Sequence, residues 1–172
     1  MLKGDNIYFR ALEPEDVEQL LSWENETENW RLSNTAVPFS RHLMTSYIQS
    51  AQDIYAVKQV RLMIVEIASG ETVGVVDLFD YEPIHQRAGV GILINQSKRK
   101  KGYALEALNL LETYALNHVG IRNLYCSIHA DNQASVNLFE KAAYQKVGER
   151  KAWFNVGGNW VDECLYQKLL IP

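Results

Sequence analysis

The strongest constraint on the fold comes from a strand–helix–strand unit at residues 88–129. Residues 88–94 form a short apolar run, residues 102–117 form a long helical pattern, and residues 123–129 are again typical of a strand. The helical pattern rests on apolar side chains at helical spacing, namely Leu105, Leu108, Leu111 and Ala115. Two strands joined through a helix run parallel, so the unit predicts one right-handed parallel crossover within a sheet.

Antiparallel hairpins precede and follow this unit. Residues 55–66 and 72–80 are rich in β-branched and aromatic side chains and flank Ser69-Gly70-Glu71, while residues 144–153 and 160–169 flank Val156-Gly157-Gly158-Asn159. Two such runs around a glycine-containing turn predict a β-hairpin. Hairpins exclude a uniformly parallel sheet, so we expect a mixed sheet with helices on both faces.

The remaining elements are predicted from caps and apolar spacing. Residues 7–12 alternate as a short strand, and Pro14 among acidic residues marks a helix start with an apolar stripe at residues 17–23. The polar residues 24–29 interrupt this helix. Capping and apolar spacing predict further helices at residues 40–53 and 132–143.

The composition is that of one soluble globular domain over residues 1–172. Apolar residues make up 47% and charged residues 22%, a balance typical of such domains. The sequence has no apolar run of 18 residues, and its first residues lack the features of a secretory signal. We therefore expect a cytoplasmic protein with no membrane partner. A formal net charge of -4 argues against nucleic acid as a partner, and the lack of CxxC spacing at Cys126 and Cys164 favours buried reduced thiols.

A basic loop joins the strand of residues 88–94 to the long helix. It contains Lys98, Arg99, Lys100 and Lys101 and is followed by Gly102. The first N–H groups of a helix lack partners within the helix, and the helix dipole is positive there, so a diphosphate would gain charge-favoured hydrogen bonds. Gly102 would let the phosphates approach the backbone closely. A solvated basic loop is the plainer alternative.

Two motifs resemble those of the GNAT superfamily of N-acetyltransferases. The spacing Arg99-x-x-Gly102-x-Ala104 is similar to that family's loop for the pyrophosphate of coenzyme A, and residues 131–144 are similar to its later helix. The resemblance extends over essentially the whole chain. It implies an α+β acyl-CoA N-acyltransferase fold, in which a central mixed, mostly antiparallel sheet of about seven strands is flanked by about four helices.

Residues 74–81 and 85–88 resemble two subgroups of that family, the bacterial spermidine acetyltransferases and the acetyltransferases of ribosomal-protein N-termini. This implies an acetyl-CoA-dependent N-acetyltransferase whose acceptor is a small-molecule amine or a peptide N-terminus. We favour a polyamine or another small primary amine. The N-terminus of a ribosomal or other protein is one alternative, and a catalytically weak acetyl-CoA-binding sensor is another. A homo-oligomer stays open in each case.

The resemblance also implies which residues bind acetyl-CoA. Backbone amides at Ile92 and Ile94 would receive the pantetheine arm and the acetyl oxygen in a gap of the sheet, as extended ligands add to a strand. Asn132 would bind the pantetheine arm, and Lys141 would reach a phosphate unless it belongs to a solvated helix face. No metal is expected. The complete set is Ile92, Leu93, Ile94, Arg99, Lys100, Lys101, Gly102, Tyr103, Ala104, Asn132, Ser135, Phe139 and Lys141.

Three departures from the family pattern lie in or near the catalytic residues. Phe139 stands where a tyrosine often serves as general acid, Gly89 stands where many relatives carry a glutamate, and Ala143 replaces a usual glycine. Asp77 is the first candidate for base or for ligand of the substrate ammonium, unless it is a hydrogen-bonded strand aspartate. Tyr144 is a candidate hydroxyl donor, unless its ring only packs at the end of its helix.

Three acidic residues are candidates for binding the acceptor together with Asp77. Glu24, Glu26 and Glu28 lie between the first two predicted helices, where this family builds its acceptor pocket. Their negative charge would attract a polyamine or a basic peptide. A solvated acidic helix end is the alternative.

Overall fold

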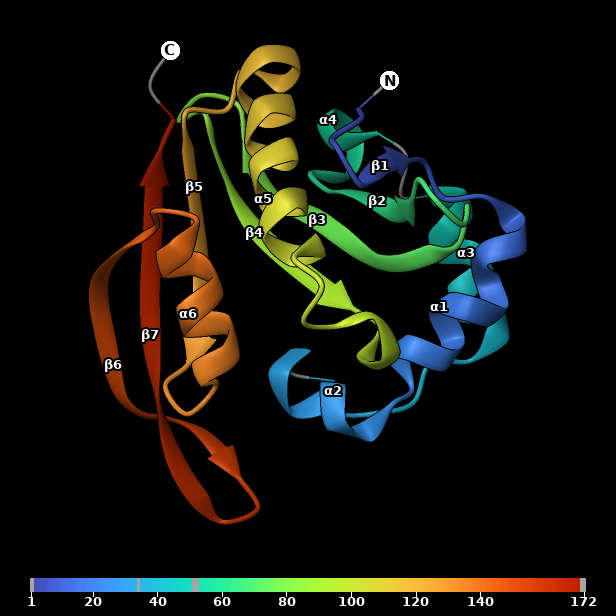
Figure 1. The fold of residues 1–172 in the computed structure, drawn as a ribbon. Helices are drawn as coiled ribbons and strands as arrows, with labels where there is room; N and C mark the ends of the chain where they lie inside the picture. Colours follow the sequence, from blue (N-terminus) through green and yellow to red (C-terminus); the bar gives the residue numbers. More distant parts are fainter. Residues whose placement is uncertain (1, 34, 51–52, 171–172) are drawn as a thin grey trace.

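A seven-stranded sheet of order β1-β2-β3-β4-β5-β7-β6 lies at the centre of the computed structural model, which describes residues 2–33, 35–50 and 53–170 (Figure 1). β4 and β5 are neighbours and run parallel, and all other neighbouring strands run antiparallel. The predicted mixed, mostly antiparallel sheet is therefore confirmed. The strands are β1 (Ile7–Arg10), β2 (Val60–Glu66), β3 (Thr72–Glu82), β4 (Arg87–Ile94), β5 (Asn123–His129), β6 (Gln145–Val156) and β7 (Asn159–Leu169).

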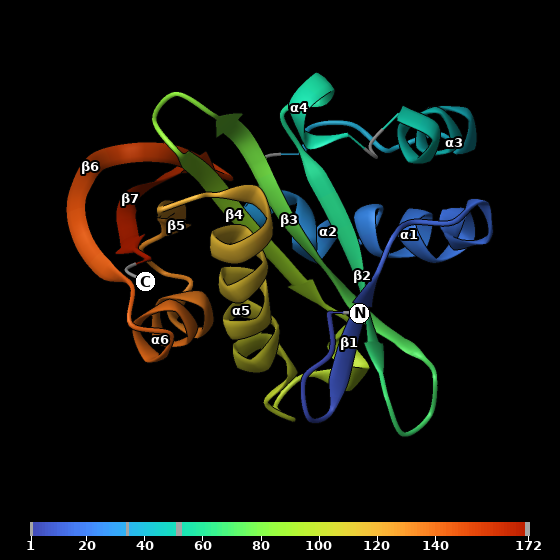
Figure 2. The same ribbon diagram turned by 90° about the horizontal axis from the view of Figure 1, so that it is seen from above.

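Helices lie on both sides of the sheet, as Figure 2 shows. The described residues hold six α-helices rather than the predicted four or so, because α2 and α4 are short additions of 7 and 4 residues. A π-helical turn, Ala115–Val119, extends α5 up to Gly120. The helices are α1 (Val17–Glu24), α2 (Thr27–Ser33), α3 (Arg41–Ser50), α4 (Ile54–Val57), α5 (Tyr103–Tyr114) and α6 (Gln133–Lys141).

The alternation of side chains along the strands produces two apolar cores, one on each face. Met63 of β2 packs in a cluster with Leu20 of α1, whereas the next residue, Ile64, packs in a cluster with Leu108 of α5. Successive residues of a strand point to opposite faces, so both faces of β2 are buried. This layering places α1 and α3 on one side of the sheet and α5 and α6 on the other.

The prediction for residues 40–66 is wrong at its centre. α3 ends at Ser50 and β2 begins only at Val60, because α4 lies between them. The Asp53 carboxylate accepts a hydrogen bond from the Tyr55 N–H and so caps α4, which ends at Lys58 in a left-handed conformation with φ 56°. Residues 51 and 52 of the predicted helix lie outside the described residues. The predicted interruption at 24–29 is also shorter than expected, because α2 begins at Thr27.

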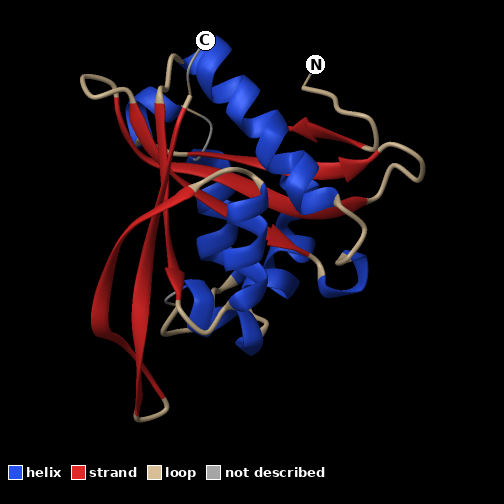
Figure 3. Cartoon of the chain, turned by 60° about the vertical axis from the view of Figure 1, so that its left-hand side comes forward, coloured by secondary structure: helices blue, strands red, loops and turns tan. Residues whose placement is uncertain are grey.

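The hairpin of β6 and β7 projects beyond the helices, as Figure 3 shows. Gly157 and Gly158 form its turn with φ of 57° and 88°. Trp153 and Trp160 on this hairpin are 53% and 63% exposed. In the described part of the chain, no helix is long and apolar enough to cross a membrane.

Candidate active site

The central sheet opens between β4 and β5. These strands pair at only three positions, from Arg87 opposite Asn123 to Gly89 opposite Tyr125, although β4 continues to Ile94 and β5 to His129. Figure 1 shows the two strands parting toward the start of α5. Backbone groups of residues 90–94 that point toward β5 therefore lack a strand partner there and can bind an extended ligand.

The loop after β4 presents backbone N–H groups at the start of α5. Asn95 accepts a hydrogen bond from the Ser97 N–H, and Arg99 Nε donates to the Ile94 carbonyl at 3.0 Å. Lys100 and Gly102 are both left-handed, with φ of 63° and 85°. A Cβ placed on Gly102 would meet no protein atom within 4 Å. The loop thus leaves open space before the first turn of α5, and this space fits a phosphate-containing ligand.

Not all of the loop's cations face that space. Lys98 forms ion pairs with Glu66 at 3.5 Å and Glu71 at 2.5 Å. Tyr103 is buried, and its hydroxyl donates to Glu66. Hydrogen bonds from Ser69 and Tyr103, with the charge of Lys98, lower the pKa of Glu66 to about 2. Lys100 and Lys101 are exposed and remain to attract an anion, while Ala104 is half-buried in the first turn of α5.

Helix α6 and its N-cap carry four more of the predicted donor-site residues. The Asn132 side chain caps this helix by accepting from the Ser135 N–H at 3.2 Å, and it donates to Ser135 Oγ at 2.9 Å. Phe139 is 4% exposed, and Lys141 is exposed near the far end of α6. Lys141 lies about two and a half turns of helix away from Asn132.

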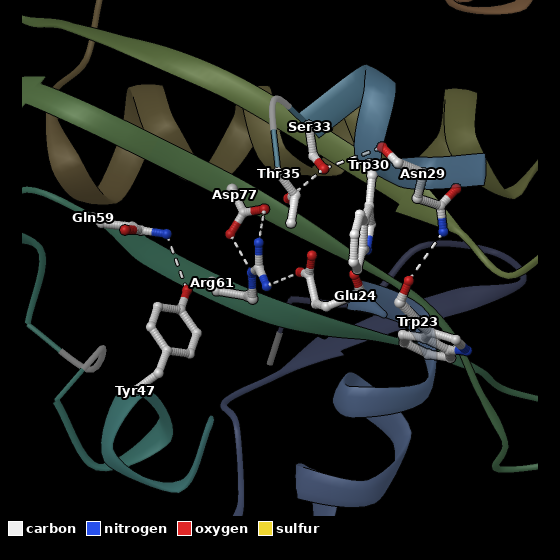
Figure 4. A network of polar contacts seen from close by, with 10 residues as sticks. All are labelled: Trp23, Glu24, Asn29, Trp30, Ser33, Thr35, Tyr47, Gln59, Arg61 and Asp77. Carbon is white, nitrogen blue, oxygen red and sulfur yellow. Dashed lines mark hydrogen bonds and ion pairs between the residues drawn. The ribbon is translucent and has the colours of Figure 1, made fainter. Parts of the chain in front are cut away.

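Asp77, Arg61 and Glu24 form a chain of ion pairs on the face covered by α1 (Figure 4). Arg61 Nε and Nη2 donate to the two Asp77 carboxylate oxygens at 2.6 and 3.0 Å, and Arg61 Nη1 donates to Glu24 Oε1 at 2.5 Å. The Asp77 carboxylate also overlies the backbone of β4, because a Cβ on Gly91 would lie 3.4 Å from Asp77 Oδ2. Arg61 thus links two carboxylates, and one of them, Asp77, lies over the residue where β4 has just parted from β5.

The other two predicted acceptor residues do not join this cluster. Glu26 accepts a hydrogen bond from Asn29 at 3.3 Å, and Glu28 accepts one from Gln96 at 3.5 Å. Glu26 lines a shallow cavity of about 440 Å³ together with residues of α1 and of the loop after β4. The three glutamates are separated because the chain turns at Asn25, which ends α1.

Tyr144 lies on the opposite face from Asp77. It is 3% exposed and packs edge-on against Phe139, with ring centroids 4.9 Å apart. Its hydroxyl is buried and has no hydrogen-bond partner in the described structure. Burial, with smaller contributions from Glu112 and Cys126, raises the pKa of Tyr144 well above its usual value. The structure therefore does not bring the two predicted catalytic residues together.

Two features of the site were not predicted from the sequence: Arg61, and the Phe79 ring that packs over Gly89. Arg61 alternates with Met63 and Val65 on a buried face of β2, and a charged residue in that register was an available signal. A Cβ on Gly89 would lie 2.4 to 2.8 Å from ring atoms of Phe79, so this ring occupies the space of any side chain at residue 89.

The two cysteines and the potential metal ligands complete the description of reactive groups. Cys126 and Cys164 are both free and buried, and burial raises the pKa of Cys126 to about 12. Across residues 2–33, 35–50 and 53–170, no three histidine, cysteine, aspartate or glutamate side chains are grouped so as to hold a metal ion.

Comparison with known proteins agrees with this geometry. A family model described as an acetyltransferase (GNAT) domain matches residues 6–145. A probable N-acetyltransferase of Bacillus subtilis is 26% identical, with 94% of this chain and 93% of that protein covered. The spermidine N(1)-acetyltransferase of Escherichia coli K12 is 27% identical over 62% of this chain and 59% of its own length.

Solved structures support the fold. A spermidine N-acetyltransferase from Vibrio cholerae, in complex with CoA and spermine, superposes with a TM-score of 0.87 at 20% identity and 97% coverage of both chains. RimL, a ribosomal L7/L12 α-N-protein acetyltransferase in complex with coenzyme A, has a TM-score of 0.85 at 19% identity, covering 97% of this chain and 96% of its own. The predicted acyl-CoA N-acyltransferase fold is confirmed.

Proposed function

The chain belongs to the GNAT family of acetyl-CoA-dependent N-acetyltransferases, and on this premise we propose that it acetylates a primary amine. Among primary amines, we favour a polyamine or another small amine. The observation that carries the proposal is the position of Asp77 and Glu24. Both carboxylates bind the Arg61 guanidinium, and that of Asp77 lies over Gly91, next to the opening between β4 and β5. A cationic amine bound there would lie close to a donor held in the opening.

Acetyl-CoA would be held by the loop, the gap and α6. The N–H groups at Gly102, Tyr103 and Ala104 and the cations Arg99, Lys100 and Lys101 would bind the pyrophosphate. Backbone groups of Ile92, Leu93 and Ile94 would hold the pantetheine arm, as would Asn132 and Ser135, while Phe139 would pack against it and Lys141 would reach a phosphate. When bound, acetyl-CoA supplies a thioester carbonyl as the electrophile.

The two carboxylates then orient the amine, and the thiolate leaves without an enzyme acid. Asp77 and Glu24 bind the ammonium, which loses one proton to solvent before its nitrogen attacks the thioester carbon. The new C–N bond forms as the C–S bond breaks, and the second proton that the nitrogen loses protonates the departing thiolate. A thiol pKa of about 8.5 makes thiolate a tolerable leaving group without an enzyme acid. The proposal assigns no proton transfer to Tyr144, whose hydroxyl is buried on the other face.

The proposal is tested by CoA-thiol release with polyamines, amino sugars, amino acids and basic peptides. We expect the highest kcat/KM with a polyamine or a small amine. Asp77→Asn should raise the acceptor KM by about tenfold or more, because a buried charged partner is lost. The affinity for acetyl-CoA should not change. If none of these amines causes thiol release, the proposal is overturned and an acetyl-CoA-binding sensor is left.

A protein N-terminus is the second candidate, and one observation favours it. Arg61 neutralises one of the two carboxylates, so the site suits a single ammonium such as a peptide α-amino group. The same panel separates the candidates, because a peptide with a free N-terminus would then exceed every polyamine in kcat/KM. N-terminal blocking of that peptide should abolish the reaction.

We also propose that the protein self-associates. One structural relative, the spermidine N-acetyltransferase from Vibrio cholerae, is described as dodecameric. In this chain, two exposed tryptophans, Trp153 and Trp160, lie on the projecting hairpin. Light scattering on the parent and on a Trp153→Ser, Trp160→Ser variant tests the proposal. A monomeric mass for the parent would refute it.

A further inference from the structure

We infer that Arg61 is a specificity-determining and positioning residue of the acceptor site, which limits that site to one ammonium group. The inference rests on the proposed acceptor site at Asp77 and Glu24. Arg61 is an internal cation that already occupies one side of this carboxylate pair. An incoming amine therefore meets one net negative charge rather than two.

The register of the sheet fixes Arg61 opposite Asp77. The two residues are Cα partners in the antiparallel ladder of β2 and β3, so their side chains leave the sheet on the same face. The contact is bidentate, with both carboxylate oxygens engaged at 2.6 and 3.0 Å. Bidentate arginine–carboxylate pairs fix direction as well as distance. Asp77 is consequently held in one orientation above Gly91.

Glu24 reaches the same guanidinium from a different layer of the protein. Its carboxylate accepts from Arg61 Nη1 at 2.5 Å, which links α1 to β2. Arg61, Asp77 and Glu24 have side-chain exposures of 16%, 10% and 13%. Charges this well shielded from water interact strongly, so one charge more or less at this point changes the affinity for a cation.

Aromatic contacts hold the guanidinium in place. The Arg61 Cζ atom lies 5.3 Å from the ring centroid of Tyr47, and the Tyr47 hydroxyl is hydrogen-bonded to Gln59 at 3.0 Å. Figure 4 shows the Arg61 guanidinium between the carboxylates of Asp77 and Glu24, with the Tyr47 ring nearby. Burial raises the pKa of Tyr47 to about 12, so its hydroxyl stays neutral and adds no charge.

Arg61 also stays charged. Burial opposes its charge, but the attraction and hydrogen bonds of Asp77, with smaller contributions from Tyr47 and Glu24, raise the pKa of Arg61 above its ordinary value. The cluster therefore carries two negative charges and one positive charge at any pH at which the carboxylates are ionised. One ammonium makes it neutral, and a second would meet no unpaired charge.

The test compares propylamine with 1,3-diaminopropane, which have the same chain length but one and two ammonium groups. In Arg61→Gln, kcat should fall for both amines because Asp77 is no longer oriented. The ratio of kcat/KM for the diamine to that for the monoamine should rise by about tenfold, since the site gains one net negative charge. Arg61→Lys should keep the ratio near that of the parent, because the charge remains.

Two further variants keep the inference falsifiable. Glu24→Gln removes a negative charge instead, so the same ratio should fall, and this holds even if Arg61→Gln does not fold. Arg10→Gln is the matched control, because Arg10 forms a similar bidentate pair with Asp16 at 2.6 and 2.7 Å in another part of the fold. It should leave the ratio unchanged.

Calorimetry with acetyl-CoA separates this inference from the proposed function. A parent protein that accepts neither these two amines nor any amine of the wider panel contradicts the proposed function itself. A different result would show that Arg61 is merely structural. The parent protein would be active and the variants would bind acetyl-CoA normally, but kcat would fall equally for both amines and the ratio of their kcat/KM values would stay constant. That result would overturn the inference and leave the acceptor site in place.

Discussion

Gly102 provides a sharp test of where the pyrophosphate of acetyl-CoA binds, because the same helix offers a matched control. Gly102 precedes α5 with φ 85°, and Gly120 follows its π-helical extension with φ 81°. A Cβ on either glycine would meet no protein atom within 4 Å. Alanine at either position therefore meets the same backbone penalty and no clash with the protein.

The two substitutions should cost the same stability and differ only in binding. A left-handed non-glycine residue costs roughly 1–2 kcal/mol. For a domain of this size, each kcal/mol lowers Tm by about 2–4 °C. Only in Gly102→Ala does the new methyl group occupy the approach of the phosphates. Losing one charge-assisted hydrogen bond, worth about 1.5–3 kcal/mol, raises the Kd for acetyl-CoA by about tenfold to a hundredfold.

Isothermal calorimetry with acetyl-CoA and thermal unfolding without it measure the two effects separately. We expect equal Tm losses in Gly102→Ala and Gly120→Ala and a raised Kd in the first variant alone. Gly102→Val should weaken binding further. If both alanine variants bind acetyl-CoA as the parent does, the phosphates do not lie at the start of α5.

Four further predictions follow from individual side chains. Glu26→Gln with Glu28→Gln should leave the acceptor KM within about threefold of the parent at ordinary salt, because neither residue contacts Asp77 and the exposed charge of Glu28 contributes little. A tenfold rise in the acceptor KM would place the two residues in the acceptor site. Phe139→Tyr should raise kcat by up to about tenfold to a hundredfold if its hydroxyl reaches the leaving sulfur, and an unchanged kcat would count against departure without an enzyme acid. Ala143→Gly should stabilise the fold by up to about 1 kcal/mol in urea unfolding, because Ala143 has φ 63° at the end of α6. Because the pKa of Glu66 is lowered to about 2, this residue stabilises the fold above pH 4.5, and its contribution is lost as the pH falls through about 2. Glu66→Gln should remove that part of the pH dependence of the free energy of unfolding, and an unaltered pH profile would contradict the prediction.

The fold was predictable where local pattern and tertiary packing agree. β5 has the predicted bounds, and both hairpin turns contain the predicted glycines. The failure at residues 54–57 has a tertiary cause. Ile54, Tyr55 and Val57 are residues typical of strands, but Ile54 is buried in the α5-side core and the Tyr55 ring packs edge-on against Tyr81 at 5.8 Å. These contacts, with the cap at Asp53, outweigh strand propensity.

The geometry of the loop before α5 was more predictable than that of the cluster at Asp77, for a physical reason. The loop from Arg99 to Ala104 is continuous in sequence, so its spacing alone predicts a helix start with a glycine before it. The cluster of Asp77, Arg61 and Glu24 joins α1, β2 and β3, and it depends on which residue lies opposite Asp77. That register is set by the whole sheet. The sequence therefore indicated Asp77 and Glu24 but not the arginine between them.

The missing glutamate at residue 89 follows from the packing of Phe79. The Phe79 ring fills the space above Gly89 and packs edge-on against Tyr125 across the strands, with centroids 6.3 Å apart. A glutamate at residue 89 would have to displace this ring, so a base could not be restored there without also replacing Phe79. Phe79 lies on the same face of the sheet as Asp77, since a Cβ on Gly91 would lie 3.8 Å from the Phe79 ring and 3.4 Å from Asp77 Oδ2. Its apolar surface disfavours charge, whereas the cluster at Asp77 would attract a cation. The amine is therefore expected to bind over Gly91 beside Asp77, and to lose its proton there rather than over Phe79 and Gly89.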